Sequence, residues 1–330
     1  MPQFSLPNVL VIGAIIVAGG VGVGVASVSA MESADACEIP VAEGKASTLV
    51  SADLSDPASP QVSFPTPLVT TGAELSVLSP GEGEPARVGG AVDFDVSVFV
   101  GSDGQYLTGS GYDPLNPVRR LVVDTDEEFF GTILACQKPG AQVIVTAPIV
   151  DVFGPIEGDD YVNDDSTVVL VIDVHNTYLA SANGSSRLPQ SGMPTVVQAP
   201  TGEHGLSFPN APIPDELRIS VLKQGSGDRV EQGDVVVTHY TSAVWNTREV
   251  FSSSFERGIP LSLMVEDLYT STSGSGIIPG LVQALVGQNV GSQVLVSVPP
   301  QLGYAPGGAP AGVPDGATLV YVLDIVGVSN

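Results

Sequence analysis

The sequence has 330 residues, enough for two domains of ordinary size, and carries 36 acidic against 11 basic residues for a formal charge of -25. A field of this sign repels phosphate backbones and anionic headgroups, and no basic cluster reverses it locally, so the composition argues against nucleic-acid binding. The 38 Gly and 27 Pro residues indicate a chain rich in strands and loops.

The N-terminal segment has the character of an export signal. Residues 8–30 are apolar and end in the small-residue run Ala26-Ser27-Val28-Ser29-Ala30, which is typical of a cleavage site. We therefore expect residues 1–30 to be a signal peptide and the protein to be exported to the extracellular space or the cell envelope. A signal peptide normally begins with Lys or Arg, whereas the first basic residue here is Lys45. The apolar core is also near the minimum length that spans a bilayer, so an uncleaved membrane anchor is the alternative.

Cys37 and Cys136 are the two cysteines of the chain. In an exported protein an isolated pair predicts a disulfide, which would tie an N-terminal arm to the first domain. Closing a loop of about 100 residues is worth nearly 5 kcal/mol in the chain-entropy model. Lipidation of Cys37 is the alternative, but the preceding Ala34-Asp35-Ala36 lacks the residues expected there. Neither interpretation makes these residues catalytic.

The sequence contains an internal repeat. Ser63-Phe64-Pro65 recurs 144 residues later as Ser207-Phe208-Pro209, and Gly140-Ala141-Gln142-Val143 recurs 151 residues later as Gly291-Ser292-Gln293-Val294. Matches at only two offsets indicate two copies of one fold. The resulting organisation is an extended arm at 31–70, a first domain at 71–179, a linker at 180–212 and a second domain at 213–330.

Each copy is predicted to be α+β, a curved antiparallel sheet wrapped around one short helix. The second-copy helix is expected at 277–287, with Pro279 in its first turn and Gly287 as the left-handed residue at its end. Leu281 and Leu285, with Val282 and Val286 beside them, should form a broad apolar face that the sheet covers. The predicted strands of this copy are 218–222, 234–241, 261–264, 292–298 and 318–326.

Common catalytic and metal-binding signatures are missing from the sequence. It has no His-Glu-x-x-His, no Gly-x-Ser-x-Gly and no Gly-Lys-Ser/Thr motif. His175, His204 and His239 fall in different elements, and the acidic run at 157–165 matches no calcium loop, so we expect neither a metal nor a cofactor.

What remains is a set of aromatic and aliphatic residues set among Gly and Pro. They predict a hydrophobic socket, although core packing alone is the alternative for aromatic residues in strands. The set comprises Tyr240, Phe251, Ile277, Ile278, Tyr304 and Tyr321.

Residues 216–328 resemble the FKBP family of peptidyl-prolyl cis-trans isomerases, and the whole chain is similar to exported bacterial proteins with two such domains in tandem. The stretches that carry the resemblance are Val237-Thr238-His239-Tyr240-Thr241, Val250-Phe251-Ser252-Ser253-Ser254, Ile277-Ile278-Pro279-Gly280-Leu281, Val298-Pro299-Pro300-Gln301-Leu302-Gly303-Tyr304 and Ala317-Thr318-Leu319-Val320-Tyr321.

The resemblance implies a proline pocket in the second domain. The Ile278 backbone N–H and the Tyr304 hydroxyl would donate to the substrate carbonyl. The implied catalytic residues are Tyr240, Phe251, Ile278, Tyr304 and Tyr321, and the implied substrate-binding residues are Ser252, Arg257, Leu261, Ile277, Leu281 and Val313.

Two positions depart from the family pattern. Ser252 stands where an acid usually follows the Phe, and Leu281 stands where a Trp usually floors the pocket, so weaker or altered activity is expected. In the first copy Val96, Leu107, Phe153 and Leu170 replace the aromatic residues at the repeat offsets. We expect that copy to be an inactive structural or binding domain.

The function that the resemblance implies is prolyl isomerisation in the folding of secreted proteins. Its partners would be proline-containing unfolded or secreted polypeptides, and macrolide immunosuppressants would be further ligands. The alternative is a chaperone-like peptide-binding module with weak or no catalytic activity, and a surface spacer without a ligand is a third class.

Overall fold

The computed structural model describes residues 37, 39–56, 60–110, 119–124, 129–156, 162–272 and 274–329. The predicted export segment at 1–30 therefore lies outside the described residues. Among the residues that are described, no helix is long and apolar enough to cross a membrane.

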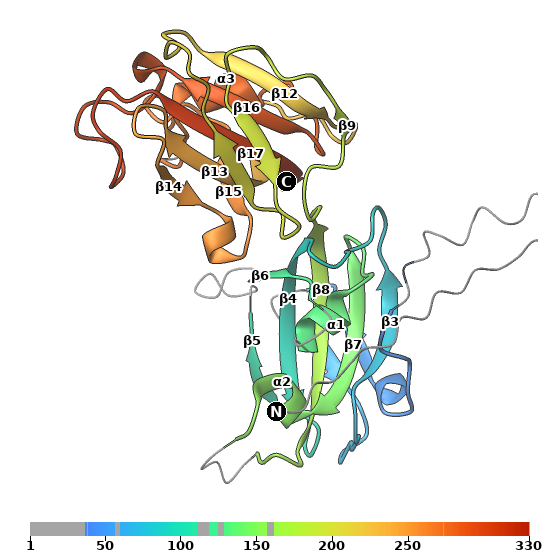
Figure 1. Ribbon diagram of the computed structural model, residues 1–330. Coiled ribbons are helices and arrows are strands. Elements are labelled where there is room, and N and C mark those ends of the chain that lie inside the picture. The colour runs from blue at the N-terminus through green and yellow to red at the C-terminus, as the bar shows by residue number, and fades with distance from the viewer. Residues whose placement is uncertain are drawn as a thin grey trace, which may run out of the picture. The chain divides into compact units, whose positions relative to one another are not determined.

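The first domain is an antiparallel sheet with the strand order β3-β7-β8-β4-β5, in which β6 also pairs with β4 (Figure 1). Two short helices, α1 (Phe129–Leu134) and α2 (Ile149–Phe153), accompany it. The strands are β3 (Glu74–Pro80), β4 (Ala91–Val100), β5 (Tyr106–Gly109), β6 (Arg119–Val122), β7 (Ala141–Pro148) and β8 (Thr167–Thr177).

The second domain repeats this sheet with the order β14-β13-β17-β16-β12-β9, in which β15 pairs with β13. Every pair of strands is antiparallel, so the predicted α+β class is confirmed. The elements are β9 (Ser185–Ser186), β12 (Arg218–Gln224), β13 (Val235–Val244), β14 (Val250–Ser253), η2 (Phe255–Arg257), β15 (Leu261–Met264), α3 (Pro279–Leu285), β16 (Gln293–Val298), η3 (Pro300–Leu302) and β17 (Leu319–Ser329).

The strand registers confirm the internal repeat. In the first domain Val96 of β4 pairs with Ile172 of β8, and in the second Tyr240 of β13 pairs with Leu323 of β17, at the offsets of 144 and 151 found in the sequence. Both ladders carry a register shift two residues earlier on the first strand of the pair. A shared irregularity of this kind is a stronger sign of common architecture than shared strands alone, because bulges are retained within families.

Each domain also includes a two-stranded hairpin that packs on the outer face of its sheet. In the predicted arm, η1 (Ser47–Leu49) is followed by β1 (Ser51–Asp53) and β2 (Gln61–Ser63). In the predicted linker, β10 (Thr195–Gln198) pairs with β11 (His204–Ser207). The segment at 180–212 is therefore not merely a connector, because it contains β9, β10 and β11 and contributes to the core of the second domain.

The two hairpins are themselves a repeat. Ser51 pairs with Ser63 in the first hairpin, and Thr195 pairs with Ser207 in the second, 144 residues further along. The following Phe64 and Phe208 each pack into the cluster under their own hairpin, and Phe208 meets Trp245 edge-on with ring centroids 5.6 Å apart. The repeated Ser-Phe-Pro motif thus marks the end of the hairpin that covers each sheet.

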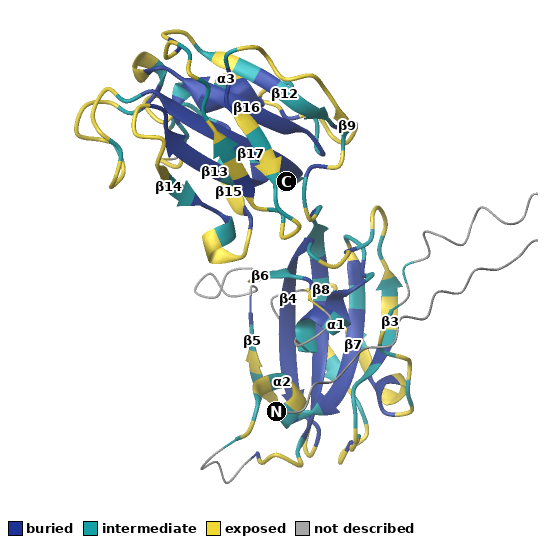
Figure 2. Cartoon of the chain, viewed as in Figure 1, coloured by how far each residue is buried: buried dark blue, intermediate teal, exposed yellow. Residues whose placement is uncertain are grey.

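Because both faces of the central strands are covered, β16 is buried along its whole length and β17 is buried as far as Gly327 (Figure 2). On β16, Val294 and Val296 pack in the cluster that contains α3, whereas Leu295 between them packs under the hairpin. Successive side chains of a strand point to opposite faces, so this strand is apolar on both faces at Val294, Leu295, Val296 and Val298, and only Gln293 and Ser297 are polar. The continuous apolar runs in the sequence follow from this two-sided burial.

Helix α3 runs from Pro279 to Leu285, two residues shorter at each end than the predicted 277–287, with Pro279 and Gly287 in their predicted roles. Pro279 is its first residue, and Gly287 just beyond it has φ +87°, a conformation that favours glycine. Leu281 and Leu285 are buried, but Val286 is 42% exposed, so the apolar face is narrower than expected.

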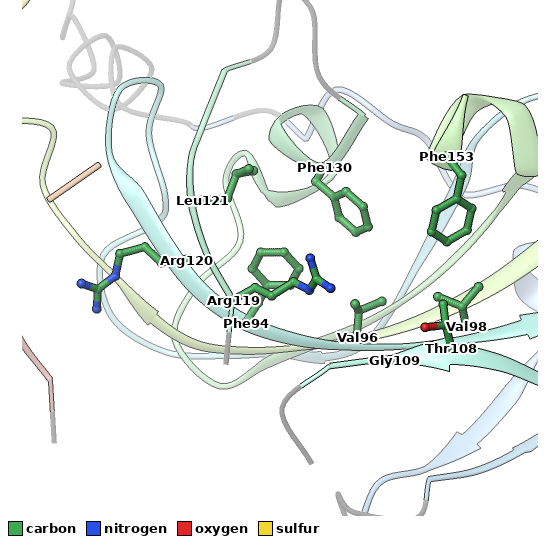
Figure 3. Close-up of a pocket in the computed structure, with 10 residues that line it drawn as sticks. All are labelled: Phe94, Val96, Val98, Thr108, Gly109, Arg119, Arg120, Leu121, Phe130 and Phe153. Carbon is green, nitrogen blue, oxygen red and sulfur yellow. The ribbon is translucent and has the colours of Figure 1, made fainter. Parts of the chain in front are cut away.

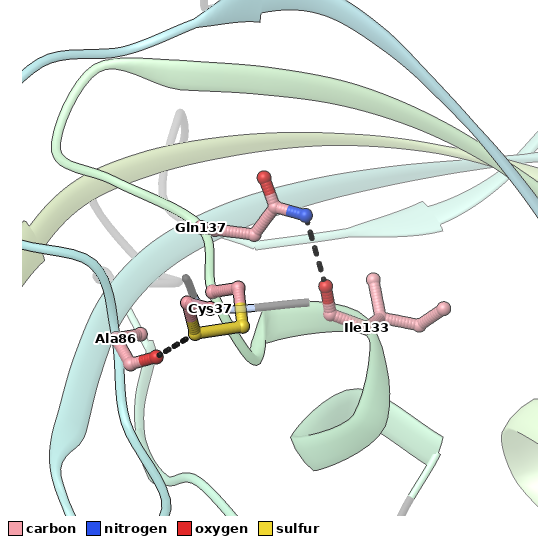
Figure 4. Close-up of a disulfide and its surroundings, with 5 residues drawn as sticks. Cys37, Ala86, Ile133 and Gln137 are labelled. Carbon is pink, nitrogen blue, oxygen red and sulfur yellow. Dashed lines mark hydrogen bonds between the residues drawn. A yellow bond between two sulfur atoms is a disulfide. The ribbon is translucent and has the colours of Figure 1, made fainter. Parts of the chain in front are cut away.

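The predicted disulfide is present between Cys37 and Cys136, with Cα atoms 5.4 Å apart (Figure 4). Cys136 lies just after α1 and has φ +67°. Its amide donates to the carbonyl of Ala86, and the neighbouring Gln137 side chain donates to the carbonyl of Ile133 at 3.2 Å. The bond therefore joins the start of the arm to the end of the first-domain helix.

Candidate functional site

The second domain contains a cavity of about 510 Å³ between its sheet and the N-terminal end of α3. This volume falls within the range of pockets that bind small ligands. Strands β13, β14, β15 and β17 provide Tyr240, Ser242, Phe251, Ser252, Leu261, Leu263, Tyr321 and Leu323, while α3 and the loops provide Leu268, Gly276, Ile277, Ile278, Leu281, Tyr304, Pro310 and Ala311.

One wall of the cavity is held by a short hydrogen-bonded chain. The hydroxyls of Tyr240 and Ser252 lie 2.7 Å apart, and Arg257 donates from Nη2 to the Tyr240 hydroxyl at 3.0 Å. The guanidinium also lies 5.7 Å from the centre of the Tyr240 ring, within cation–π range. Arg257 thus fixes Tyr240 from outside the cavity rather than lining it.

Tyr321 places an unpartnered polar group inside the site. The residue is 4% exposed, its ring meets Phe251 edge-on at 6.1 Å, and its hydroxyl finds no hydrogen-bond partner among the described residues. Burial raises the pKa of this hydroxyl well above its usual value, and the neighbouring hydroxyls of Tyr304 and Tyr240 raise it further. The group is therefore a neutral donor, and a ligand would share it with the neighbouring hydroxyl of Tyr304.

A second free donor lies where the chain enters α3. The backbone amide of Ile278 donates to no described residue, while the amide of the preceding Ile277 is already bonded to the carbonyl of Glu266. On the other side of the cavity, Tyr269 holds the loop around Tyr304. Its hydroxyl donates to the carbonyl of Gly303 at 3.0 Å and accepts from the amide of Ala305 at 2.6 Å.

A buried polar cluster on the second domain ties its hairpin to its sheet. Asp324 of β17 lies 3.2 Å from His204 of β11 and accepts hydrogen bonds from Gln293 at 2.7 Å and the Ala182 amide at 2.9 Å. Burial alone would raise the pKa of Asp324, but these bonds outweigh it and hold the pKa below its usual value. The nearby His239 has its pKa lowered by burial, against the attraction of Asp324.

The structure brings most of the predicted site residues to one cavity. Nine of the eleven line it, Arg257 supports it through Tyr240, and Val313 packs in the same core cluster without lining the cavity. Sequence analysis missed the loop residues Leu268, Pro310 and Ala311, for which no pattern in the chain gives a signal. Strand residues Ser242 and Leu323 were missed as well, although they lie two positions from Tyr240 and Tyr321 and so share their face.

The first domain retains a smaller hollow of about 300 Å³ at the same place in the repeat (Figure 3). The β4–β6 and β13–β15 ladders show the correspondence, because Phe94 pairs with Arg119 as Thr238 pairs with Leu261. The hollow is lined by Phe94, Val96, Val98, Thr108, Gly109, Arg119, Arg120, Leu121, Phe130 and Phe153. The aromatic hydroxyls of the second domain are replaced, but the cavity itself persists.

A model of the FKBP-type peptidyl-prolyl cis-trans isomerase family matches residues 227–326. The probable FK506-binding protein of Corynebacterium glutamicum is 30% identical over 121 residues, which are 37% of this chain and 94% of the relative. The FK506-binding protein of Streptomyces anulatus is 32% identical over 125 residues, again 37% of this chain and 94% of the relative. A crystal structure of the three FKBP domains of wheat FKBP73 is 17% identical and covers 78% of this chain and 94% of that one, with a TM-score of 0.32.

The family match falls within the second domain, where the apolar cavity, the free Ile278 amide and the three tyrosines lie together. The sequence relatives are covered almost along their whole length. The chain therefore belongs to the FKBP family of peptidyl-prolyl cis-trans isomerases.

Proposed function

We propose that the second domain isomerises X-Pro bonds in its apolar cavity and that catalysis is confined to this domain. The observation that carries the proposal is the convergence of Phe251, Tyr321 and Tyr304 with the free Ile278 amide around one cavity of about 510 Å³. The Ile278 amide and the tyrosine hydroxyls are the donors that a substrate carbonyl would meet, and the apolar walls suit a prolyl ring. The first domain keeps no tyrosine in its hollow.

Such a site needs no acid, base or nucleophile. Rotation about an X-Pro bond has a barrier of about 18–20 kcal/mol because resonance is lost as the amide twists. An apolar cavity that removes water from the carbonyl disfavours the charge-separated planar amide relative to the twisted one, so the transition state is bound more tightly. Lowering the barrier by about 5 kcal/mol would accelerate rotation more than a thousandfold.

The substrates that we propose are unfolded, proline-containing chains outside the cytoplasm. The apolar segment at 8–30 supports export, and the Cys37–Cys136 disulfide supports an oxidising compartment. Sequencing the N-terminus of the mature protein distinguishes a signal cleaved near Ala30 from an intact membrane anchor. Because two relatives are named FK506-binding proteins, we also propose that a macrolide of this class competes for the same cavity.

A protease-coupled assay of X-Pro peptide turnover by the full chain tests the proposal. We expect Phe251→Ala to abolish most of the turnover and Tyr304→Phe to lower it, because the first removes a wall and the second a donor. Tyr106→Phe is the matched control, because it removes the same hydroxyl group from an exposed tyrosine of the first domain, away from the cavity. Unchanged turnover in both cavity variants would show that the site has been assigned wrongly.

The second candidate function is peptide binding without efficient catalysis. Two positions favour it: Ser252 occupies the place of the usual acid, and Leu281 makes the floor smaller than the usual aromatic residue would. Calorimetric titration with X-Pro peptides separates the two functions. Binding that Phe251→Ala removes, in a chain that shows no turnover, would identify a chaperone-like module instead of an enzyme.

A further inference from the structure

The lining of the first-domain hollow contains charged residues, whereas that of the second-domain cavity contains none among the described residues. Arg119 of β6 occupies the ladder position of Leu261 of β15, which lines the second-domain cavity. Around it the walls stay apolar, with Phe94 and Phe130 rings 5.6 Å apart and Phe153 across the opening. The repeat has thus produced an apolar hollow with a cation at its edge.

Two adjacent arginines lie at this hollow and behave differently. Figure 3 shows the Arg119 guanidinium inside the hollow, near Phe94, Val96 and Phe130, while Arg120 points away from it. Arg120 is fully engaged, because its Nε and Nη2 donate to the two carboxylate oxygens of Asp93 at 2.6 and 2.7 Å. In contrast, no described residue forms an ion pair or hydrogen bond with the Arg119 side chain.

An unpaired guanidinium beside apolar walls favours one ligand chemistry. Its planar fork of donors matches a carboxylate, and Arg119 is exposed, so the guanidinium is open to a ligand that also contacts the apolar walls. The rest of the molecule offers little competition for an anion, since the chain has only 11 basic residues against 36 acidic ones. Arg119 therefore favours an anionic group at this hollow, although the net negative charge of the protein repels anions elsewhere.

We propose that the first domain binds a peptide segment that presents a carboxylate next to a large apolar side chain. The apolar side chain enters the hollow between Phe94, Phe130 and Phe153, and the carboxylate pairs with Arg119. The Thr108 hydroxyl on the neighbouring strand β5 is a further polar group of the lining. A C-terminal carboxylate after an apolar residue and an internal Asp before one supply the same chemistry.

Fluorescence anisotropy of labelled, proline-free peptides with the full chain tests this site. One pair ends in Leu-Phe with either a free or an amidated C-terminus, and the other contains an internal Asp-Phe or Asn-Phe. We expect at least one carboxylate peptide to bind up to about fivefold more tightly than its neutral counterpart. The pair that shows the difference identifies which kind of carboxylate the hollow accepts.

Variants of the cation complete the test. Arg119→Leu introduces the residue that the second domain has at this position and should weaken carboxylate binding up to about fivefold. Arg119→Lys keeps the charge without the fork and should fall between wild type and Arg119→Leu. Lys45→Leu is the control, because it removes one exposed positive charge from the arm of the same domain and should leave binding unchanged.

The proposal is overturned if neither carboxylate peptide binds, if neutral and anionic peptides bind equally, or if Arg119→Leu binds as wild type does. It is also overturned if Lys45→Leu weakens binding as much as Arg119→Leu, because net charge alone would then explain the effect. Failure of X-Pro turnover in the second domain would leave these outcomes unaffected.

Discussion

Replacing Tyr321 by Phe should stabilise the second domain while it weakens the site. The Tyr321 hydroxyl is buried without a hydrogen-bond partner among the described residues, and a buried unsatisfied polar group costs about 1–3 kcal/mol. Phenylalanine keeps the ring and its edge-on contact with Phe251 and removes only that group. We expect the free energy of unfolding to rise by about 1–2 kcal/mol, close to the lower end of that range.

Urea unfolding followed by tryptophan fluorescence measures this change in the full chain. Trp245 is the one tryptophan, lies in the second domain, and is 4% exposed under the β10–β11 hairpin rather than in the cavity. With a slope of about 2 kcal/mol per M, the urea midpoint of Tyr321→Phe should rise by about 0.5–1 M. X-Pro turnover should fall in the same variant, because a donor to the substrate is lost.

Tyr240→Phe is the matched contrast, because it removes the same group from the same cavity but should lower the free energy of unfolding instead of raising it. The Tyr240 hydroxyl is bonded to Ser252 and Arg257, so its loss should lower stability by about 1 kcal/mol. If Tyr321→Phe is as stable as wild type or less stable, the Tyr321 hydroxyl of the wild type is hydrogen-bonded to water or to Tyr304. Tyr321 is then not a free donor.

Three further changes test other parts of the structure. Reduction of the Cys37–Cys136 disulfide should destabilise the first domain by about 4–5 kcal/mol, measured by circular dichroism during thermal unfolding. The unfolding midpoint that Trp245 fluorescence reports for the second domain should not shift. Equal shifts in the two signals would contradict this expectation. The second domain should lose stability as the pH falls below 6.5, because burial lowers the pKa of His239 in the folded state. It should lose stability again below about pH 3.8, because hydrogen bonds lower the pKa of Asp324 in the folded state. A urea midpoint that is constant from pH 7 to 5 would refute the expectation for His239. Ser252→Asp should raise X-Pro turnover by restoring a carboxylate beside the twisting amide, and an unchanged or lower rate in the coupled assay would show that the acid has no role here.

The strands and the helix of the second domain could be predicted because their signals are local. The segment 261–264 coincides with β15, and Pro279 and Gly287 bound α3 as expected. The hairpin at β10–β11 lies in the predicted linker, because residues of β10 alternate between exposed and partly buried and leave only a weak apolar pattern in the sequence. The one signal that could have revealed it is the repeated Ser-Phe-Pro motif, which ends both hairpins.

The cavity was predictable only in part, for a physical reason. Residues such as Tyr240 and Tyr321 lie on strands, so their spacing alone places them on one face. Leu268 and Pro310 come from loops whose paths depend on contacts such as the bonds of Tyr269 to Gly303 and Ala305, and sequence spacing carries no record of those contacts. The place of Arg119 in the first-domain hollow could not be predicted for a related reason, because only the β4–β6 register shows that it occupies the position of Leu261.

The two-sided burial of each sheet explains how the two cavities could diverge while the fold stayed the same. Central strands such as β7 and β16 are held from one face by the hairpin and from the other by the cluster that contains the helix, so the hairpin face does not depend on what lines the cavity. The pattern of substitution agrees, because Val143 and Val145 of β7 keep their equivalents Val294 and Val296 of β16, whereas Val96 faces its hollow where the second domain has Tyr240. Cavity residues have therefore changed chemistry while the hairpin-covered face and the β7 and β16 valines kept the fold. One fold thus carries a neutral cavity with hydroxyl donors in the second domain and a hollow with a cation in the first.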